Sequence, residues 1–135
     1  MIVSTKGRYA LRVMADMAAA GSLYTPMKDV AARQGVSKKY MEQIMPLLVK
    51  GGLVEGVRGL GGGYRLTKKP EEYTLFEILS LVEGDLAPVS CLECGAEPCP
   101  KRGECRTLPM WTKLHDMIGD YLDSVTLADL LAGKA

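Results

Sequence analysis

The sequence predicts a mainly α-helical protein with one small β-hairpin. Three observations lead to this fold class: apolar residues recur at helical spacing in several segments, hydroxyl-bearing residues stand where helices should begin, and a glycine-rich stretch separates two short strand-like segments. The composition is that of an ordinary globular chain, with 135 residues of which 47% are hydrophobic and 24% charged. A chain of this length has room for one sizeable hydrophobic core.

Three helices are predicted at the start of the chain, over residues 4–20, 26–34 and 38–50. Thr25 is placed to cap the second helix with its hydroxyl, and Gly35 suits the left-handed residue that ends it. The second and third helices are short and are joined by a glycine-containing turn. This is the pattern of a helix-turn-helix.

The third helix has an apolar face and a polar face with different predicted roles. The apolar face should pack on the first two helices and consists of Met41, Ile44, Leu47 and Leu48. Near the N-terminus, where such helices reach DNA bases, Gln can bind adenine, Glu can accept from cytosine, and Lys can bind phosphate or guanine. The predicted DNA contacts here are Ser37, Lys38, Lys39, Tyr40, Glu42 and Gln43. Taken alone, this stretch is better explained as a solvated helix face.

The next segment predicts a β-hairpin, with strands near residues 53–58 and 64–69 around the loop Gly59-Leu60-Gly61-Gly62-Gly63. In a winged helix-turn-helix domain such a hairpin is the wing, where glycine lets the backbone approach phosphates and arginine enters a narrow minor groove. The predicted DNA contacts of the wing are Arg58, Gly61, Gly62 and Arg65. A nucleotide-phosphate loop is disfavoured, because the glycines lead into a strand and no Gly-Lys-Ser/Thr follows. Together, helices and wing favour duplex DNA binding over a plain tight turn.

Thr74 and Glu77 form a capping-box pattern that begins a further helix. This helix completes the predicted winged helix-turn-helix DNA-binding domain, residues 1–83. The charge distribution agrees with a DNA-binding first half: residues 1–69 carry 12 lysines and arginines against 4 acidic residues, whereas residues 70–135 carry 5 against 12. A strongly basic segment is expected to bind a polyanion.

Residues 84–108 form a predicted cysteine-rich loop. Its four cysteines, Cys91, Cys94, Cys99 and Cys105, stand among prolines and glycines. Thiolates on a short polar loop converge without closing a long chain, so we interpret them as the ligands of a metal or iron–sulfur centre. A thiol–disulfide switch is the alternative. The spacing fits neither a zinc ribbon nor the usual ferredoxin run.

Residues 109–135 predict a long helix and then a short tail helix that Thr126 begins. Apolar residues of the long helix step by four and three, in heptad fashion, at Trp111, Leu114, Ile118, Tyr121 and Val125. The DNA-binding domain is expected to be closed by its own helices and wing. We therefore expect this dimerisation helix to pair with its copy in a second chain, which would make the protein a homodimer.

Several classes of protein are disfavoured. No apolar run approaches the roughly 18–20 residues of a membrane span, and Met1–Lys6 lacks the pattern of a signal peptide, so we expect a cytoplasmic protein with no membrane partner. Cysteines normally stay reduced there. His115 is the only histidine and has no evident catalytic partner. We therefore expect neither an enzyme nor a small-molecule substrate.

Four stretches of the chain resemble the Rrf2 family of bacterial transcription regulators. They are Ser4-Thr-Lys-Gly-Arg-Tyr-Ala10, Tyr40-Met-Glu-Gln-Ile44, Gly52-Leu-Val54 and Val57-Arg-Gly-Leu-Gly-Gly-Gly-Tyr64. The likeness covers nearly the whole chain, and its glycine-rich wing is the most specific part. It implies a homodimer of winged-helix domains crossed through long C-terminal helices, with Glu42, Gln43 and Arg58 at base-reading positions.

The resemblance also implies a cofactor. In family members that sense iron–sulfur clusters, three loop cysteines hold a 2Fe–2S cluster, and Cys91, Cys99 and Cys105 match their positions. The histidine that completes their ligand set is replaced here by Leu108, which cannot ligate, and Cys94 is additional. The fourth ligand is therefore Cys94 or a residue from elsewhere, or the site binds something other than a cluster.

These observations predict a cytoplasmic, dimeric, sequence-specific DNA-binding regulator. It would sense iron–sulfur cluster status or oxidants and control genes for cluster biogenesis. One alternative is a DNA-binding regulator with a metal-free disulfide switch. Another is an iron–sulfur carrier that does not bind DNA, which would need the cysteine loop but not the basic helix and wing.

Overall fold

The computed structural model describes residues 3–21, 23–59 and 61–135, so Leu60 of the predicted wing loop lies outside the described residues. The helices and strands are α1 (Thr5–Ala19), α2 (Met27–Gln34), α3 (Lys38–Lys50), β1 (Val54–Val57), β2 (Gly63–Leu66), α4 (Leu75–Glu83), α5 (Leu108–Ser124) and α6 (Leu127–Leu131). Short 3₁₀ turns cover Pro70–Glu72 and Ser90–Leu92. The predicted mainly helical fold with a small antiparallel hairpin is confirmed.

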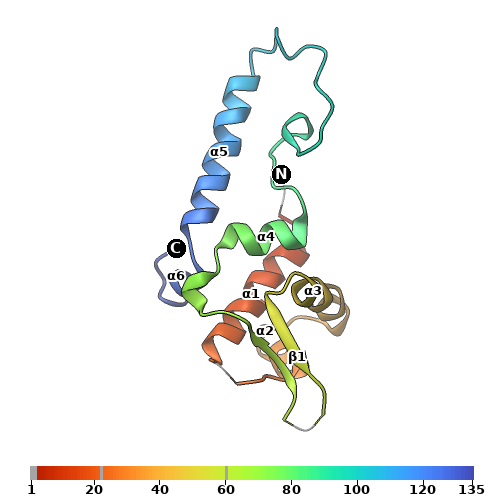
Figure 1. The fold of residues 1–135 in the computed structure, drawn as a ribbon, viewed down its shortest axis with the longest axis vertical. Helices are drawn as coiled ribbons and strands as arrows, with labels where there is room; N and C mark the ends of the chain where they lie inside the picture. The colour runs from red at the N-terminus through yellow and green to blue at the C-terminus, as the bar shows by residue number, and fades with distance from the viewer. Residues whose placement is uncertain (1–2, 22, 60) are drawn as a thin grey trace.

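The molecule consists of a compact body and one projecting helix. Figure 1 shows α1 to α4, α6 and the hairpin packed together, while α5 rises away from them and the cysteine-rich loop connects its far end back to α4. The wing and the cysteine-rich loop therefore lie at opposite ends of the molecule. Any effect of one on the other must pass through the body or along α5.

Local side-chain bonds set the ends of the helix-turn-helix. The Ser37 hydroxyl accepts a hydrogen bond from the Tyr40 amide at 3.3 Å, which satisfies an otherwise unpaired amide in the first turn of α3. Gly35 ends α2 with φ of 63°, a left-handed conformation that glycine adopts without steric cost. Both residues behave as the sequence predicts.

Thr25 does not cap α2, and this prediction was wrong. Its backbone forms two hydrogen bonds of 2.8 Å with Tyr64, so that it extends the edge of the hairpin as an isolated β-bridge. Pro26 takes the N-cap position without a side-chain bond. The sequence signal was misleading because α2 begins at Met27 and not at Pro26, which leaves Thr25 one position ahead of the N-cap.

The core extends beyond the three N-terminal helices and the wing that we expected to close the domain. Tyr73, ahead of α4, and Leu127, the first residue of α6, are both fully buried in the same hydrophobic cluster as the apolar face of α1. On α3, Met45 is buried, whereas Leu47 is only partly buried. The C-terminal tail therefore returns to the body and contributes to its core.

The orientation of α2 on α1 depends on a partly exposed charge pair. Asp16 of α1 accepts hydrogen bonds from the Arg33 guanidinium at 2.6 and 3.0 Å and from the Gln34 amide at 2.9 Å. The hydrogen bond from Arg33 lowers the pKa of Asp16, and burial opposes it. Only 6% of the Asp16 side chain is exposed, whereas 49% of Arg33 is.

We expect Asp16→Asn to lower the free energy of unfolding at pH 7 by about 1–2 kcal/mol, because it removes the charge from a hydrogen bond to Arg33. The effect is modest because Arg33 is partly exposed to solvent. A carboxylate with a lowered folded-state pKa stabilises the protein above the unfolded value of about 4, and this contribution is lost as the pH falls through the folded-state pKa. Urea unfolding of both proteins at pH 7 and at acidic pH measures this. Asp123→Asn on exposed α5 is the control. A difference independent of pH would contradict the prediction.

Candidate nucleic-acid interface and cysteine site

The polar face of α3 is open at its N-terminal end. Ser37, Lys38, Lys39, Glu42 and Gln43 are all exposed. Lys38 and Glu42 form an ion pair of 3.8 Å, one turn apart on the helix. Because both side chains are largely in solvent, this pair is weak and can open at little cost when a ligand approaches.

Tyr40, predicted as a DNA contact, has a packing role. Its ring stacks edge-on against Tyr9 of α1 with centroids 5.1 Å apart. The Arg12 guanidinium lies 5.3 Å from the Tyr9 ring and donates a hydrogen bond to the Gln34 carbonyl. The Tyr9–Tyr40 contact holds the start of α3 against α1, and the Arg12–Gln34 hydrogen bond holds the end of α2 there. Both join residues far apart in the sequence, so periodicity gave no signal for them.

The two arginines that flank the wing loop differ in their surroundings. Arg58 is exposed at the end of β1. Arg65 on β2 donates to the Glu55 carboxylate at 2.5 Å across the hairpin, and its guanidinium lies 4.5 Å from the Tyr24 ring. The hydrogen bond to Glu55 raises the pKa of Arg65. The structure thus presents Arg58 to solvent and uses Arg65 to hold the hairpin.

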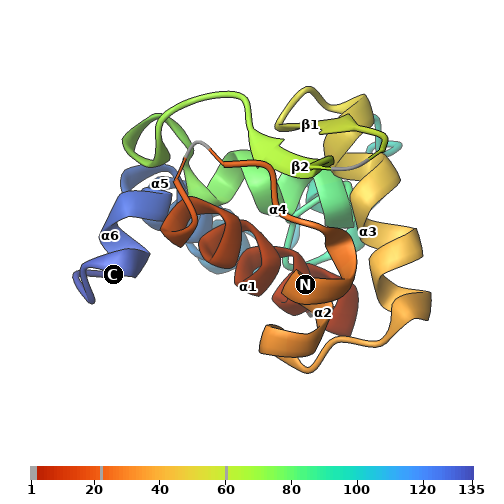
Figure 2. The same ribbon diagram turned by 90° about the horizontal axis from the view of Figure 1, so that it is seen from below.

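The wing loop needs glycine at more than one position. Gly61 is exposed with φ of 75°, and Gly62 lies so close to the backbone of Val57 and Gly59 that an added Cβ would collide with it. Strand β1 of the hairpin packs against α3. Figures 1 and 2 both show the hairpin alongside this helix. An exposed polar helix end and a glycine-rich hairpin with an outward arginine thus form one surface.

Three of the four cysteines line one cavity. Cys91, Cys99 and Cys105 surround a space of about 40 Å³ together with Leu92, Arg102 and Leu108. All four cysteines are free thiols, and Cys105 is the least exposed of them. In the described part of the chain, no group of three or more histidine, cysteine, aspartate or glutamate side chains is arranged to hold a metal ion. The loop thus gathers three thiols, and Leu108 occupies the place beside them.

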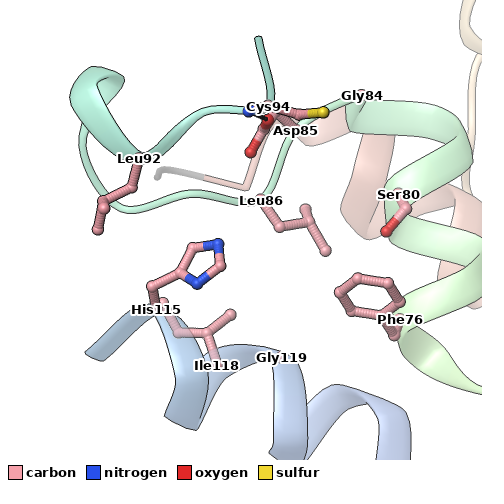
Figure 3. A pocket seen from close by; sticks show the side chains of 10 residues that line it. All are labelled: Phe76, Ser80, Gly84, Asp85, Leu86, Leu92, Cys94, His115, Ile118 and Gly119. Atoms are coloured by element: carbon pink, nitrogen blue, oxygen red, sulfur yellow. Dashed lines mark hydrogen bonds between the residues drawn. The ribbon is translucent and has the colours of Figure 1, made fainter. Parts of the chain in front are cut away.

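Cys94 lies apart from these three thiols. Its amide donates to the Asp85 carboxylate at 2.7 Å, and this hydrogen bond, with a second from the Ala87 amide, lowers the pKa of Asp85. Cys94 lines a separate pocket of about 330 Å³ between α4, α5 and the loop, which Figure 3 shows from close by. His115 and Phe76 point into that pocket from α5 and α4. In this arrangement Cys94 contributes to a different site.

Cys105 is the thiol whose environment favours the thiolate. Its sulfur lies 3.3 Å from the hydroxyl of Thr107, the N-cap of α5. Hydrogen bonds from the Thr107 hydroxyl and amide, and from the Leu108 amide, lower the pKa of Cys105, while burial opposes the shift. A thiolate is the form that binds metals and attacks disulfides.

Helix α5 has no buried residue. Its exposed apolar side chains, at heptad-like steps of four, three and four, are Met110, Leu114, Met117 and Tyr121. The stripe that the sequence predicted is therefore displaced. Trp111 and Ile118 are only partly exposed, and Val125 is the C-cap, buried in the body. An apolar stripe of this length exposed on a projecting helix marks an interaction surface.

The fold and the surface of α3 and wing define a winged helix-turn-helix DNA-binding protein. Residues 3–133 match the Rrf2 family, which is described as an iron-dependent transcriptional regulator. The chain belongs to the Rrf2 family and is a transcriptional regulator that binds DNA, not an enzyme. None of the described helices is long and apolar enough to cross a membrane.

Relatives with different names match the chain about equally well. The HTH-type transcriptional regulator IscR of Aliivibrio salmonicida is 39% identical over 132 residues, covering 97% of this chain and 77% of that protein. The structure of CymR, the global cysteine regulator of Bacillus subtilis, matches with a TM-score of 0.79 at 34% identity, covering 100% and 99% of the two chains. An oxidized form of Staphylococcus aureus CymR matches with a TM-score of 0.73 at 33% identity, covering 97% and 96%.

We expect Thr107→Val to raise the apparent pKa of Cys105 toward the ordinary cysteine value of about 8.5, because the substitution removes the hydroxyl but keeps the helix amides. The pH profile of iodoacetamide alkylation, followed at Cys105 by peptide mass spectrometry, measures this. Ser90→Ala, beside Cys91, is the control. Overlapping Cys105 profiles for wild type and Thr107→Val would show that the hydroxyl has no such role.

Proposed function

We propose that this regulator binds operator DNA as a homodimer and that its cysteine-rich loop senses the state of an iron–sulfur cluster. The observation that carries the proposal is the convergence of Cys91, Cys99 and Cys105 on one cavity beside the first turn of α5. A change of ligation there acts on the helix that projects from the body. We extend the proposal to control of cluster-biogenesis genes in the cytoplasm.

The chemistry of the donors supports a cluster at three positions, although the described side chains are not arranged as a metal site and the loop must adjust to bind one. Cys91, Cys99 and Cys105 would supply thiolates, the ligands that iron–sulfur clusters use, and a bound cluster would supply a redox-sensitive group at the start of α5. The lowered pKa of Cys105 favours ligation. The other residues that line the cavity are Leu92, Arg102 and Leu108, none of which is a usual ligand. The fourth ligand must come from outside this lining, either from Cys94 after a rearrangement of the loop or from another molecule.

A disulfide switch is the second candidate, and a specific observation favours it. The cysteines are free thiols on a loop at the surface, and one of the structural relatives was solved in an oxidized form. The Cys105 thiolate would attack an oxidised low-molecular-weight disulfide, and a second loop thiol would displace the small thiol to close an internal disulfide. Both candidates use Cys105 and the loop cysteines but differ in iron content.

Anaerobic purification followed by iron and acid-labile sulfide assays separates the two candidates. We expect coloured protein that contains iron and sulfide, and tighter binding to one class of operator for the loaded form than for the stripped form. Single serine variants of Cys91, Cys99 and Cys105 should lose the cluster. Cys94→Ser identifies the fourth ligand, because loss of the cluster assigns it to Cys94 and retention assigns it to another molecule. Iron-free protein whose affinity changes only with reversible oxidation would favour the disulfide switch. Identical affinity in every state would remove the sensing proposal.

DNA binding by the α3 and wing surface gives separate expectations for two residues. Gln43→Ala should relax base preference, at a cost of about 1–3 kcal/mol on the preferred site, because a bidentate base contact is lost. Arg58→Ala should weaken binding and lower the salt dependence by about one charge, because an exposed cation of the wing is lost. Fluorescence anisotropy at several salt concentrations measures both. Lys134→Ala, at the distant C-terminus, is the control, and equal losses in all three variants would contradict the assignment.

The homodimer proposal depends on the exposed stripe of α5. A charge at Leu114 or Met117 would be placed in an apolar interface, so Leu114→Glu and Met117→Glu should give monomers with unchanged helix content. Analytical ultracentrifugation and circular dichroism measure this. Thr112→Glu, on the opposite side of the helix, should stay dimeric. Wild-type protein that sediments as a monomer would overturn the proposal.

A further inference from the structure

We infer that Tyr73 is the positioning residue that ties the setting of the wing to the setting of α5. The inference deepens the proposed function and rests on it in one respect, since sensing requires that the cysteine-rich loop move α5. The physical coupling itself depends only on contacts within the body. These contacts fall into two groups, one on the side chain of Tyr73 and one on the backbone around it.

The side chain of Tyr73 holds both strands of the wing at their base. Its ring is fully buried. Its hydroxyl donates to the Leu53 carbonyl at 2.7 Å and accepts from the amides of Thr67 and Lys68 at 2.9 and 3.0 Å. Leu53 immediately precedes β1 and Thr67 immediately follows β2. A single buried hydroxyl therefore joins the two ends of the hairpin and connects them to the segment ahead of α4.

A second contact reinforces this attachment. The Lys68 ammonium lies 4.7 Å from the centre of the Tyr73 ring and donates to the Glu77 carboxylate of α4 at 3.0 and 3.2 Å. The sequence predicted Glu77 as half of a capping box, and its amide does bond to Thr74, but its carboxylate meets Lys68. The end of β2 is thus held to α4 and to Tyr73 together.

The backbone around Tyr73 holds the C-terminal end of α5. The Tyr73 carbonyl accepts from the Leu127 amide at 3.0 Å, and the Leu75 amide donates to the Val125 carbonyl at 2.9 Å. Thr74 and Thr126 face each other between these bonds as an antiparallel bridge. Val125, the C-cap of α5, and Leu127 are both buried. The lower end of α5 in Figure 1 is therefore joined to residues 73–75.

The two attachments share one residue, and this has a mechanical consequence. If α5 tilts, its buried end at Val125 displaces the bridge or breaks it. A displaced bridge moves the Tyr73 backbone, and the enclosed ring must follow, because its hydroxyl has three hydrogen bonds and no room to reorient. The base of the hairpin then moves with it. Since β1 packs against α3 and the hairpin carries Arg58, the position of Arg58 relative to α3 changes.

Tyr73→Phe tests the coupling, because it removes only the hydroxyl. The perturbation is Val125→Ala, which loosens the end of α5, and the readout is the set of amide chemical-shift changes in the wing. We expect Val125→Ala to shift the amides of Gly61 and Arg65 when it is made in the wild-type protein. When Val125→Ala is made in the Tyr73→Phe variant, these chemical-shift changes should be smaller by at least about half. The four proteins form a double-mutant cycle, which detects coupling between the two sites. Equal shifts in both backgrounds would overturn the inference.

Matched controls separate coupling from general loosening. Val13→Ala creates a comparable defect at a fully buried position on α1 that makes none of these hydrogen bonds. Its effect on the wing amides should be the same in both backgrounds. If Tyr73→Phe does not fold, Thr67→Val replaces it as a milder change in the same group of hydrogen bonds, since the Thr67 hydroxyl bonds the Gly52 carbonyl at 2.7 Å and lies 3.2 Å from the Tyr73 oxygen.

A final comparison distinguishes failure of the inference from failure of the proposed function. In wild-type protein, the operator affinities of the cluster-loaded and stripped forms should differ by a factor of about 5 or more, which is typical of allosteric coupling. In Tyr73→Phe the ratio of the two affinities should approach about 1, while the iron content stays unchanged. A ratio near 1 in wild type contradicts sensing, and the Val125 cycle still decides whether Tyr73 couples α5 to the wing. If the affinity ratio in Tyr73→Phe is as large as in wild type, the role of Tyr73 is contradicted, whereas cluster sensing is not.

Discussion

The packing of α1 against the rest of the body is the constraint on which the structure depends. Its apolar face, formed by Ala10, Val13, Met14 and Met17, is almost completely buried and touches the other body helices and the hairpin. At its N-terminus, Glu83 of α4 accepts from the Ser4 hydroxyl and amide at 2.6 and 3.0 Å. Because one helix organises the recognition helix, the wing and the return of the C-terminus, these parts form a single body.

Two chemically different ends are attached to this body. The basic end presents α3 and Arg58 to solvent, and as an Rrf2-family regulator the protein binds DNA. The other end gathers three thiols around one cavity and places Cys94 in a separate pocket with His115. The separation of Cys94 from the other three thiols is informative, because equivalent thiols on a short loop were expected to converge as one set. The packing of Asp85 against the Cys94 amide instead holds this cysteine beside α4 and α5.

Interactions between residues close in the sequence could be predicted better than interactions between distant segments. Ser37 and Gly35 behaved as predicted, and Thr126 caps α6 in a full capping box with Asp129, because each of these bonds joins residues within five positions of each other. Thr25 was misassigned because α2 begins one residue later than predicted, and the backbone of Thr25 pairs instead with Tyr64 on the hairpin. The DNA contact of Arg65 stays a prediction, and nothing in the sequence indicated the cross-strand carboxylate and the aromatic ring that hold its guanidinium.

The order of the helices, the glycine-rich wing, the basic first half and the grouping of cysteines could all be predicted from the sequence, because helical periodicity, capping, turn chemistry and charge are local properties of the chain. The separation of Cys94 from the other three cysteines, the exposure of particular apolar side chains on α5 and the connection of the wing to the end of α5 through Tyr73 all came from the folded structure. Those outcomes depend on contacts between distant segments, which exist only when the whole core has formed.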